Sequence, residues 1–207
     1  MRIRLFAASL VACAGFAAAA QAAVTINQGT SAPTYENTLT FDEVGGPTGA
    51  DVPGNSWLSK GITELAAGVG PNNGFVGTSP GFGSGNAYSG AFGAYFTFAQ
   101  PITALSIQWK DDSGPATFFG GGATIIAQDA MGNELASIYL SNPGAVGTSN
   151  WFNVVATGGS TFSKLVCTGF DFFPTSTVDN VSWSIPAPGA TALVGMGGLL
   201  AFRRRRA

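Results

Sequence analysis

The sequence of 207 residues contains no histidine and only two cysteines. Without histidine the chain lacks the Ser-His-Asp and Cys-His arrangements that activate nucleophiles, and it lacks the commonest ligand of zinc and iron sites. It also has no GxxxxGK motif followed by Ser or Thr, which argues against nucleotide chemistry. One cysteine, Cys13, falls in an N-terminal apolar stretch. The other, Cys167, alternates with apolar neighbours, which predicts a buried thiol without an intramolecular disulfide.

The N-terminus has the features of a secretion signal. Arg2 and Arg4 precede an apolar run from Leu5 to Ala20, and Ala20-Gln21-Ala22 has the small residues of a signal-peptidase site. We interpret residues 1–22 as a cleaved signal peptide. A bacterial lipoprotein cleavage box at 10–13 is the alternative, although cleavage there would leave an apolar segment of only about eight residues.

Positive charge is scarce in the remaining body. Lys60, Lys110 and Lys164 are the only basic residues between 23 and 186, against eleven acidic residues, which gives this segment a net charge of −8. An acidic body repels nucleic acid and anionic lipid surfaces, so we expect no nucleic-acid partner. It is compatible with divalent cations and with neutral polymers.

The body also lacks a helical pattern, because no stretch keeps a helical apolar period for three turns. Short segments rich in Val, Ile, Thr, Phe and Trp recur between Gly, Pro, Asn and Asp clusters instead. Leu105, Ile107 and Trp109 alternate with polar residues, as in a strand with one buried face. The pattern therefore predicts an all-β body.

Other segments support the same fold class. Two apolar arms, 124–128 and 135–140, flank Gly132-Asn133 and predict a hairpin. The further strand candidates are 37–44, 60–65, 151–156, 162–167, 169–173 and 178–185. Roughly eight to ten strands predict one domain over residues 23–185, a two-sheet antiparallel β-sandwich that is jelly-roll-like.

Aromatic residues supply the candidate ligand-binding side chains. Residues 68–93 contain nine glycines among 26 residues. This composition predicts a long surface loop pinned by its aromatic residues, or a binding loop that presents rings such as Tyr88 to a sugar. Trp57 and Trp151 are further candidates for stacking on a sugar ring, although either is alternatively a plug at a strand end.

One carboxylate is expected on an apolar face. Alternation places Asp179 beside Val181 and Trp183, where a bare carboxylate would be costly to bury. One hypothesis is a structural Ca²⁺ held by Asp179, by Glu43 or Asp42, and by backbone carbonyls. The alternative is that Asp179 caps nearby backbone amides without a metal.

The C-terminal segment 186–207 has three parts. Pro186, Ala187, Pro188 and Gly189 come first, an apolar stretch runs to Phe202, and the last part is Arg203, Arg204, Arg205 and Arg206. This pattern resembles the PEP-CTERM sorting signal of Gram-negative bacteria that make extracellular polysaccharide. Ala187 stands where the usual motif has glutamate. The resemblance implies an exosortase-type sorting enzyme as partner, a transient stay in the inner membrane, and a final location at the cell surface or outside the cell.

The length of the tail agrees with temporary membrane insertion. The 14 residues from Gly189 to Phe202 rise about 21 Å as a helix, short of the roughly 30 Å hydrocarbon core. With flanking residues and snorkelling arginines this short hydrophobic helix spans marginally, and the arginines stay on the cytoplasmic side. An ordinary C-terminal membrane anchor is the alternative.

The body more weakly resembles lectin-like and carbohydrate-binding-module-like sandwiches, through 151–170 and the strand 178–183. In such bodies the aspartate of the last strand often belongs to a calcium site, which corresponds to Asp179. We therefore expect an exported, non-catalytic surface or extracellular-matrix protein that binds glycan or extracellular polysaccharide. The alternatives are a carboxylate-dependent glycan hydrolase or lyase, and an ice-binding or adhesive surface protein.

Overall fold

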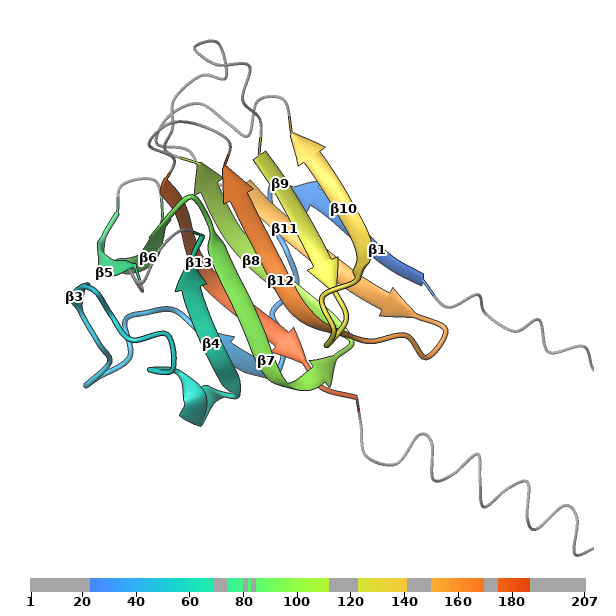
Figure 1. The fold of residues 1–207 in the computed structure, drawn as a ribbon, viewed down its shortest axis with the longest axis horizontal. Coiled ribbons are helices and arrows are strands. Elements are labelled where there is room, and N and C mark those ends of the chain that lie inside the picture. The colour runs from blue at the N-terminus through green and yellow to red at the C-terminus, as the bar shows by residue number, and fades with distance from the viewer. Residues whose placement is uncertain are drawn as a thin grey trace, which may run out of the picture.

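The computed structural model describes residues 23–68, 74–79, 82, 85–111, 123–140, 150–169 and 175–186. Apart from the short 3₁₀ helix η1 (Leu58–Lys60), its regular elements are strands, and they form two antiparallel sheets (Figure 1). The expected signal peptide and all but the first residue of the expected sorting tail lie outside the described residues. In the part of the chain that is described, no helix has the length and apolar character needed to cross a membrane.

The larger sheet has eight strands in the order β1-β11-β8-β13-β6-β5-β3, with β2 also paired to β13. The last strand, β13, occupies its middle, because β8 pairs along one side while β6 and β2 share the other. The strands of this sheet are β1 (Ala23–Gly29), β2 (Asn37–Leu39), β3 (Gly49–Ala50), β5 (Phe75–Thr78), β6 (Asn86–Ala91), β8 (Ala104–Asp111), β11 (Asn150–Thr157) and β13 (Thr175–Ser184).

The smaller sheet has five strands in the order β10-β9-β12-β7-β4, and it faces the viewer in Figure 1. Its outer strands are β10 and β4, so both of them have one unpaired edge within the sheet. The strands are β4 (Ile62–Ala67), β7 (Ala94–Ile102), β9 (Ala123–Gln128), β10 (Glu134–Leu140) and β12 (Phe162–Gly169).

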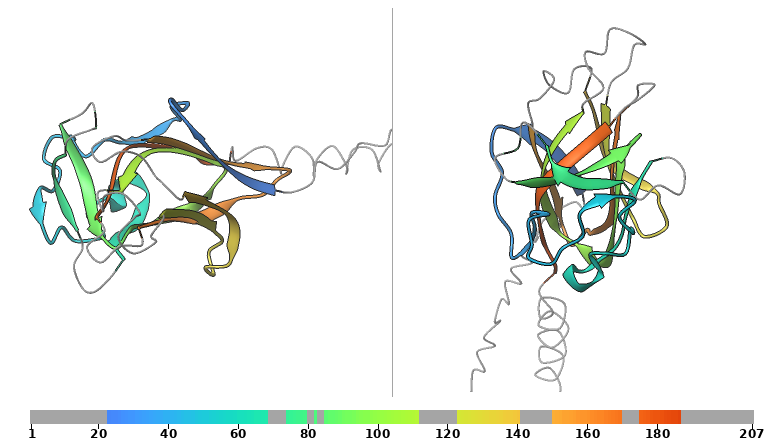
Figure 2. Two further views of the ribbon diagram at one scale, coloured as in Figure 1. Left: turned by 90° about the horizontal axis from the view of Figure 1, so that it is seen from above. Right: turned by 90° about the vertical axis from the view of Figure 1, so that its left-hand side faces the viewer.

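The core lies between the two layers, which Figure 2 shows from above. The predicted face of β8 is confirmed, since Leu105, Ile107 and Trp109 are fully buried. Trp109 packs edge-on against Phe152, with ring centroids 5.6 Å apart. Between the sheets, Phe98 of β7 packs against Trp183 of β13, with ring centroids 5.5 Å apart. Burying a large apolar side chain stabilises a fold by about 1.5–3 kcal/mol, so such contacts hold the two sheets together. The all-β, two-sheet prediction is therefore confirmed.

The predicted hairpin at 124–140 is also confirmed, as β9 and β10. Asp129 closes its turn, because Oδ1 accepts hydrogen bonds from the backbone N–H groups of Met131 and Asn133 at 2.8 and 2.9 Å. Gly132 takes the positive φ of 90° that the turn requires. On the neighbouring β12, Cys167 is a buried free thiol, as its alternation predicts.

The glycine-rich segment differs from its prediction as a surface loop. Within residues 68–93, Phe75–Thr78 and Asn86–Ala91 form β5 and β6, which extend the larger sheet beyond β13. Gly77 leaves room for the ring of Phe75 on its own strand, because a Cβ at Gly77 would clash with that ring. The absence of a side chain at Gly77 therefore lets the Phe75 ring pack closely against the strand. Farther upstream, β2 is shorter than the predicted 37–44, since Phe41 adopts a left-handed φ of 62°.

A β-bulge alters the face on which one carboxylate lies. The register of β13 with β8 shifts between Asp179 and Ser182, and Asn180 within the bulge has a φ of 48°. Asp179 lies opposite Gln108, on the side of the sheet that faces away from the core, and it is fully buried there. The expectation that Asp179 shares a face with Val181 and Trp183 is therefore wrong, because the extra residue breaks the alternation.

Candidate binding cleft on the five-stranded sheet

Two rows of side chains cross the outward face of the smaller sheet. Strand pairing aligns the first row across β4, β7, β12 and β9. The second row is displaced from it by two residues on each of these antiparallel strands. The intervening residues, such as Leu65, Phe96 and Leu165, are buried in the core, so both rows point away from it. The first row is Glu64, Thr97, Lys164 and Gln128, and the second is Ala66, Tyr95, Val166 and Ile126.

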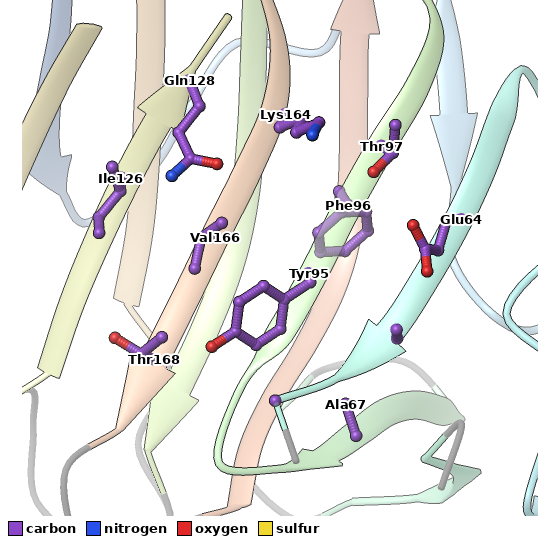
Figure 3. A pocket seen from close by; sticks show the side chains of 12 residues that line it. Glu64, Ala67, Tyr95, Phe96, Thr97, Ile126, Gln128, Lys164, Val166 and Thr168 are labelled. Atoms are coloured by element: carbon purple, nitrogen blue, oxygen red, sulfur yellow. The ribbon is translucent and has the colours of Figure 1, made fainter. Parts of the chain in front are cut away.

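A cleft of about 560 Å³ lies over these rows, and Figure 3 shows the side chains that line it. We call it the sheet cleft. Its middle is apolar, formed by the second row, and its edges are polar. The polar groups come from the first row and from Thr168 on the opposite side. Because four different strands contribute, the rigid sheet fixes the spacing of these groups.

Four polar side chains of the sheet cleft have no partner in the described chain, whereas Thr168 donates to the Thr124 carbonyl oxygen at 3.4 Å. Within those residues, the side chains of Glu64, Gln128 and Lys164 and the hydroxyl of Tyr95 make no hydrogen bond or ion pair. Lys60 differs, since its Nζ lies 3.4 Å from Glu43 Oε1. The cleft therefore holds donors and acceptors that remain available to a ligand.

The remaining lysine is also engaged elsewhere. Lys110 is buried, with a relative exposure of 3%, and its Nζ lies 5.4 Å from the centroid of the Phe82 ring. Lys164 thus differs from both of the other lysines of the body. Desolvation raises the pKa of Tyr95, so its hydroxyl stays protonated at neutral pH and can both donate and accept a hydrogen bond.

Two glycines let the Tyr95 ring lie against the sheet. A Cβ at Gly93 would stand 2.7 Å from Tyr95 Cε2, and one at Gly68 would stand 2.8 Å from the same atom. Figure 3 shows the ring lying flat along the sheet, with one face toward the open side of the cleft. Gly93 has a φ of +146°, which other residues rarely adopt. The ring therefore forms a flat aromatic platform.

The sheet cleft does not have the pair of carboxylates that glycoside cleavage uses. Among its described lining residues Glu64 is the one carboxylate. Glu134 lies at the far end of the same row, four strand spacings or about 19 Å away, whereas such pairs are about 5–10 Å apart. Glu134 also accepts a hydrogen bond from Ser137 Oγ at 2.6 Å.

Two of the three aromatic residues predicted to bind sugar are inaccessible. Trp57 is 4% exposed and packs edge-on against Phe41, with centroids 5.5 Å apart, and against Tyr88 at 5.9 Å. Tyr88 is fully buried, and this burial raises the pKa of its phenol. Both predictions are corrected, because a ring enclosed in the core cannot stack on a sugar. Local pattern could not separate a strand-end plug from a surface platform.

Trp151 has a different environment. It is half-buried on the larger sheet and lines a small cleft of about 110 Å³ together with Thr38 and Asn180. The strand pairing places it opposite Gln108, facing away from the core. A role of Trp151 in ligand binding stays a prediction, and this cleft lies on the opposite sheet from the Tyr95 platform.

The three predicted calcium ligands each have other partners. Asp42 accepts hydrogen bonds from the backbone N–H groups of Gly85 and Asn86, at 3.0 and 2.7 Å. Glu43 Oε1 accepts from the Thr40 backbone at 3.0 Å and pairs with Lys60, as described above.

Asp179 accepts from the backbone N–H of Asn180 at 2.7 Å and from its Nδ2 at 3.1 Å, so it bonds to a nearby backbone amide as the alternative expects. The described residues contain no group of three or more acidic, Cys or His side chains able to hold a metal ion. Asp42, Glu43 and Asp179 therefore do not form a three-carboxylate site, and a Ca²⁺ held by fewer of them stays a prediction.

The residues of the sheet cleft were not singled out by sequence reasoning. Alternation in 94–98 and 162–167 places Tyr95, Thr97 and Lys164 on solvent-facing sides, which is the signal that the sequence does carry. That Glu64, Lys164 and Gln128 share a row depends on a strand order that is not the chain order. Their assembly is a result of the tertiary structure.

No protein-family model matches the chain, and no curated protein sequence matches it. Among solved structures, it is similar to a glycoside hydrolase family 43 arabinoxylan arabinofuranohydrolase from Bacillus subtilis, with 9% identity, a TM-score of 0.38, and coverage of 67% of this chain and 27% of that one. It is similar to the K1 cleaved adhesin domain of Lys-gingipain from Porphyromonas gingivalis, with 13% identity, a TM-score of 0.35, and coverage of 79% and 99%. These values are too low to define a shared family.

Proposed function

We propose that the body is a non-catalytic module that binds a glycan in the sheet cleft. The observation that carries this proposal is a flat Tyr95 ring beside the unpartnered side chains of Glu64, Lys164 and Gln128. A sugar ring has apolar C–H faces and hydroxyl groups around its rim. A flat aromatic surface suits the face, and convergent hydrogen-bonding groups suit the rim.

The charge of the body narrows the class of polymer. A net charge of −8 between residues 23 and 186 repels a polyanion over a Debye length of about 8 Å in physiological salt. Within the cleft, Glu64 and Lys164 contribute one charge of each sign. A neutral polysaccharide meets no net repulsion at such a site, and its hydroxyl groups can bond to both side chains.

We further propose that the protein is exported and sorted to the cell surface or the extracellular matrix. Residues 1–22 act as the signal peptide, and residues 186–207 act as a PEP-CTERM-like tail read by an exosortase-type enzyme at the inner membrane. The support comes from the sequence, namely the Pro-Ala-Pro-Gly motif, the apolar stretch and the four terminal arginines. The jelly-roll-like body then acts outside the cell, in contact with extracellular polysaccharide.

Glycan-array binding by the purified full-length chain tests the binding proposal. Tyr95→Ala should abolish the signal, and Phe75→Ala is the matched control, since Phe75 is a 44% exposed aromatic on the other sheet. Incubation with the polymers that bind should release no shorter products. Product release would favour the alternative of a carboxylate-dependent hydrolase or lyase. Absence of both binding and turnover would favour a purely structural matrix role.

Expression in a bacterium that encodes an exosortase tests the sorting proposal. The released protein should have lost the tail by mass, and a variant with Arg203–Arg206 replaced by alanine should not be processed. Expression in a matched strain without the exosortase gene is the control. Equal processing in both strains would contradict the assignment of residues 186–207 and favour an unrelated protease.

A further inference from the structure

The outward face of the smaller sheet continues past the sheet cleft. A third row lies beyond Tyr95 and Val166, and it follows the same strand pairing. Thr168 on β12 lies opposite Thr124 on β9, which lies opposite Tyr139 on β10. Gly93, next to β7, begins this row and lies below the Tyr95 ring. The third row thus connects the Tyr95 platform with the edge strand.

Tyr139 is an exposed aromatic residue at the far end of that row. Its relative exposure is 62%, whereas its neighbours Ile138 and Leu140 are half-buried and pack against the core. Because alternate residues of a strand face opposite sides, Tyr139 faces outward with Thr124 and Thr168. Within the described residues its hydroxyl makes no hydrogen bond. Packing among the described residues therefore does not account for the exposed position of this ring.

The floor of the third row is low and polar. Between Gly93 and Tyr139 this row carries only the short side chains of Thr168 and Thr124, and the apolar Val166 and Ile126 of the second row lie beside it. Thr168 Oγ1 donates to the Thr124 carbonyl oxygen at 3.4 Å, which holds this side chain close to the sheet. Among the described side chains, both threonines are short enough for a ligand chain to pass over them.

The spacing of the rings sets the size of the ligand. Tyr95 is on β7 and Tyr139 is on β10, so three strand spacings, about 14 Å, separate their backbones. A single sugar ring cannot touch both tyrosines at that separation. We propose that Tyr139 is a second stacking platform of the same site, and that the ligand is an extended polysaccharide chain crossing the strands from Tyr95 to Tyr139.

This inference rests on the proposed glycan binding and adds to it a direction and a minimum length. The occupant is a polymer, since it must extend from the Tyr95 platform across β12 and β9 to reach Tyr139. A monosaccharide or disaccharide contacts the Tyr95 platform alone. Longer oligosaccharides also contact the threonine floor and Tyr139, so their affinity increases with length.

Size-graded xylo-, cello- and β-1,3-gluco-oligosaccharides, from disaccharide to octasaccharide, provide the probes for calorimetric titration. For the series that binds, Tyr139→Ala should weaken the affinity for the octasaccharide about tenfold and leave the affinity for the disaccharide unchanged. Tyr139→Phe keeps the ring and should restore the affinity. Phe75→Ala should bind all lengths as the original chain does, and thermal melting should show that each variant is folded.

The outcomes separate this inference from the proposed function. An octasaccharide that binds Tyr139→Ala as tightly as the original chain overturns the role of Tyr139, while glycan binding stands. A disaccharide that binds as tightly as the octasaccharide overturns the extended ligand. If the original chain binds neither these oligosaccharides nor any glycan of the array, the proposed function fails, and the inference fails with it.

Discussion

Replacing Gly93 by alanine tests whether the Tyr95 ring is held against the sheet. A Cβ at this position would lie 2.7 Å from Tyr95 Cε2 and 2.8 Å from the Cys167 carbonyl oxygen. The φ of +146° adds backbone strain of about 1–3 kcal/mol for a residue with a side chain. Crowding against packed atoms costs about 1–3 kcal/mol more. Gly93→Ala should therefore lower the free energy of unfolding by about 2–6 kcal/mol.

Gly159→Ala provides the matched control, because Gly159 also has a positive φ, of +84°, but a Cβ added there would meet no atom within 4 Å. In this variant the free energy of unfolding should fall only by the strain of a left-handed alanine, about 1–2 kcal/mol. Urea unfolding followed by tryptophan fluorescence measures both variants. In a protein that already carries Tyr95→Ala, Gly93→Ala should lower the free energy of unfolding by less, because the clash with the ring is removed. The clash with the Cys167 carbonyl oxygen remains.

The difference between the two glycine variants decides the result. If Gly93→Ala and Gly159→Ala lose the same free energy within about 0.5 kcal/mol, the crowding inferred at Gly93 is absent. The Tyr95 ring would then not be fixed as a platform. In that case Gly93→Ala should also leave glycan binding unchanged, which the array experiment measures independently.

Three further results are expected. Hydrogen bonds, first that from the Asn133 side chain, lower the pKa of Asp129 in the folded protein. The stabilisation by its carboxylate is therefore complete above the unfolded pKa of about 3.9 and is lost as pH falls through the lower folded pKa. The urea midpoints of Asp129→Ala and the original chain should thus converge in acid. Burial raises the pKa of the Cys167 thiol, so immediate labelling of the native protein would contradict the structure. Trp57→Ala should lower the free energy of unfolding in urea by about 3–5 kcal/mol. If Trp57 were a surface residue, this free energy would hardly change.

The faces of single strands could be predicted from the sequence. Alternation identified the buried sides of 105–109 and 152–154, and it identified the burial of Cys167. The turn closed by Asp129 followed from its residues, since Asx and glycine chemistry is local. These features depend on neighbours within a few positions, and the two-residue period of a strand is enough to reveal them.

The candidate site could not be predicted in the same way. Glu64, Tyr95, Lys164 and Gln128 come from strands far apart in the chain, and only the sheet order places them in adjacent rows. Trp57 illustrates the opposite error. The turn residues beside this tryptophan favour a surface position, whereas in the structure Phe41 and Tyr88 enclose its ring.

By itself the sequence determined the fold class, the acidic charge, the absence of histidine chemistry and the two terminal segments on which the export proposal depends. The tertiary structure alone decided which strands are neighbours, that a bulge at Asn180 turns Asp179 away from the core, and that part of the glycine-rich segment forms β5 and β6. The physical reason is that strand propensity is local, whereas strand pairing and side-chain burial depend on how the whole chain packs.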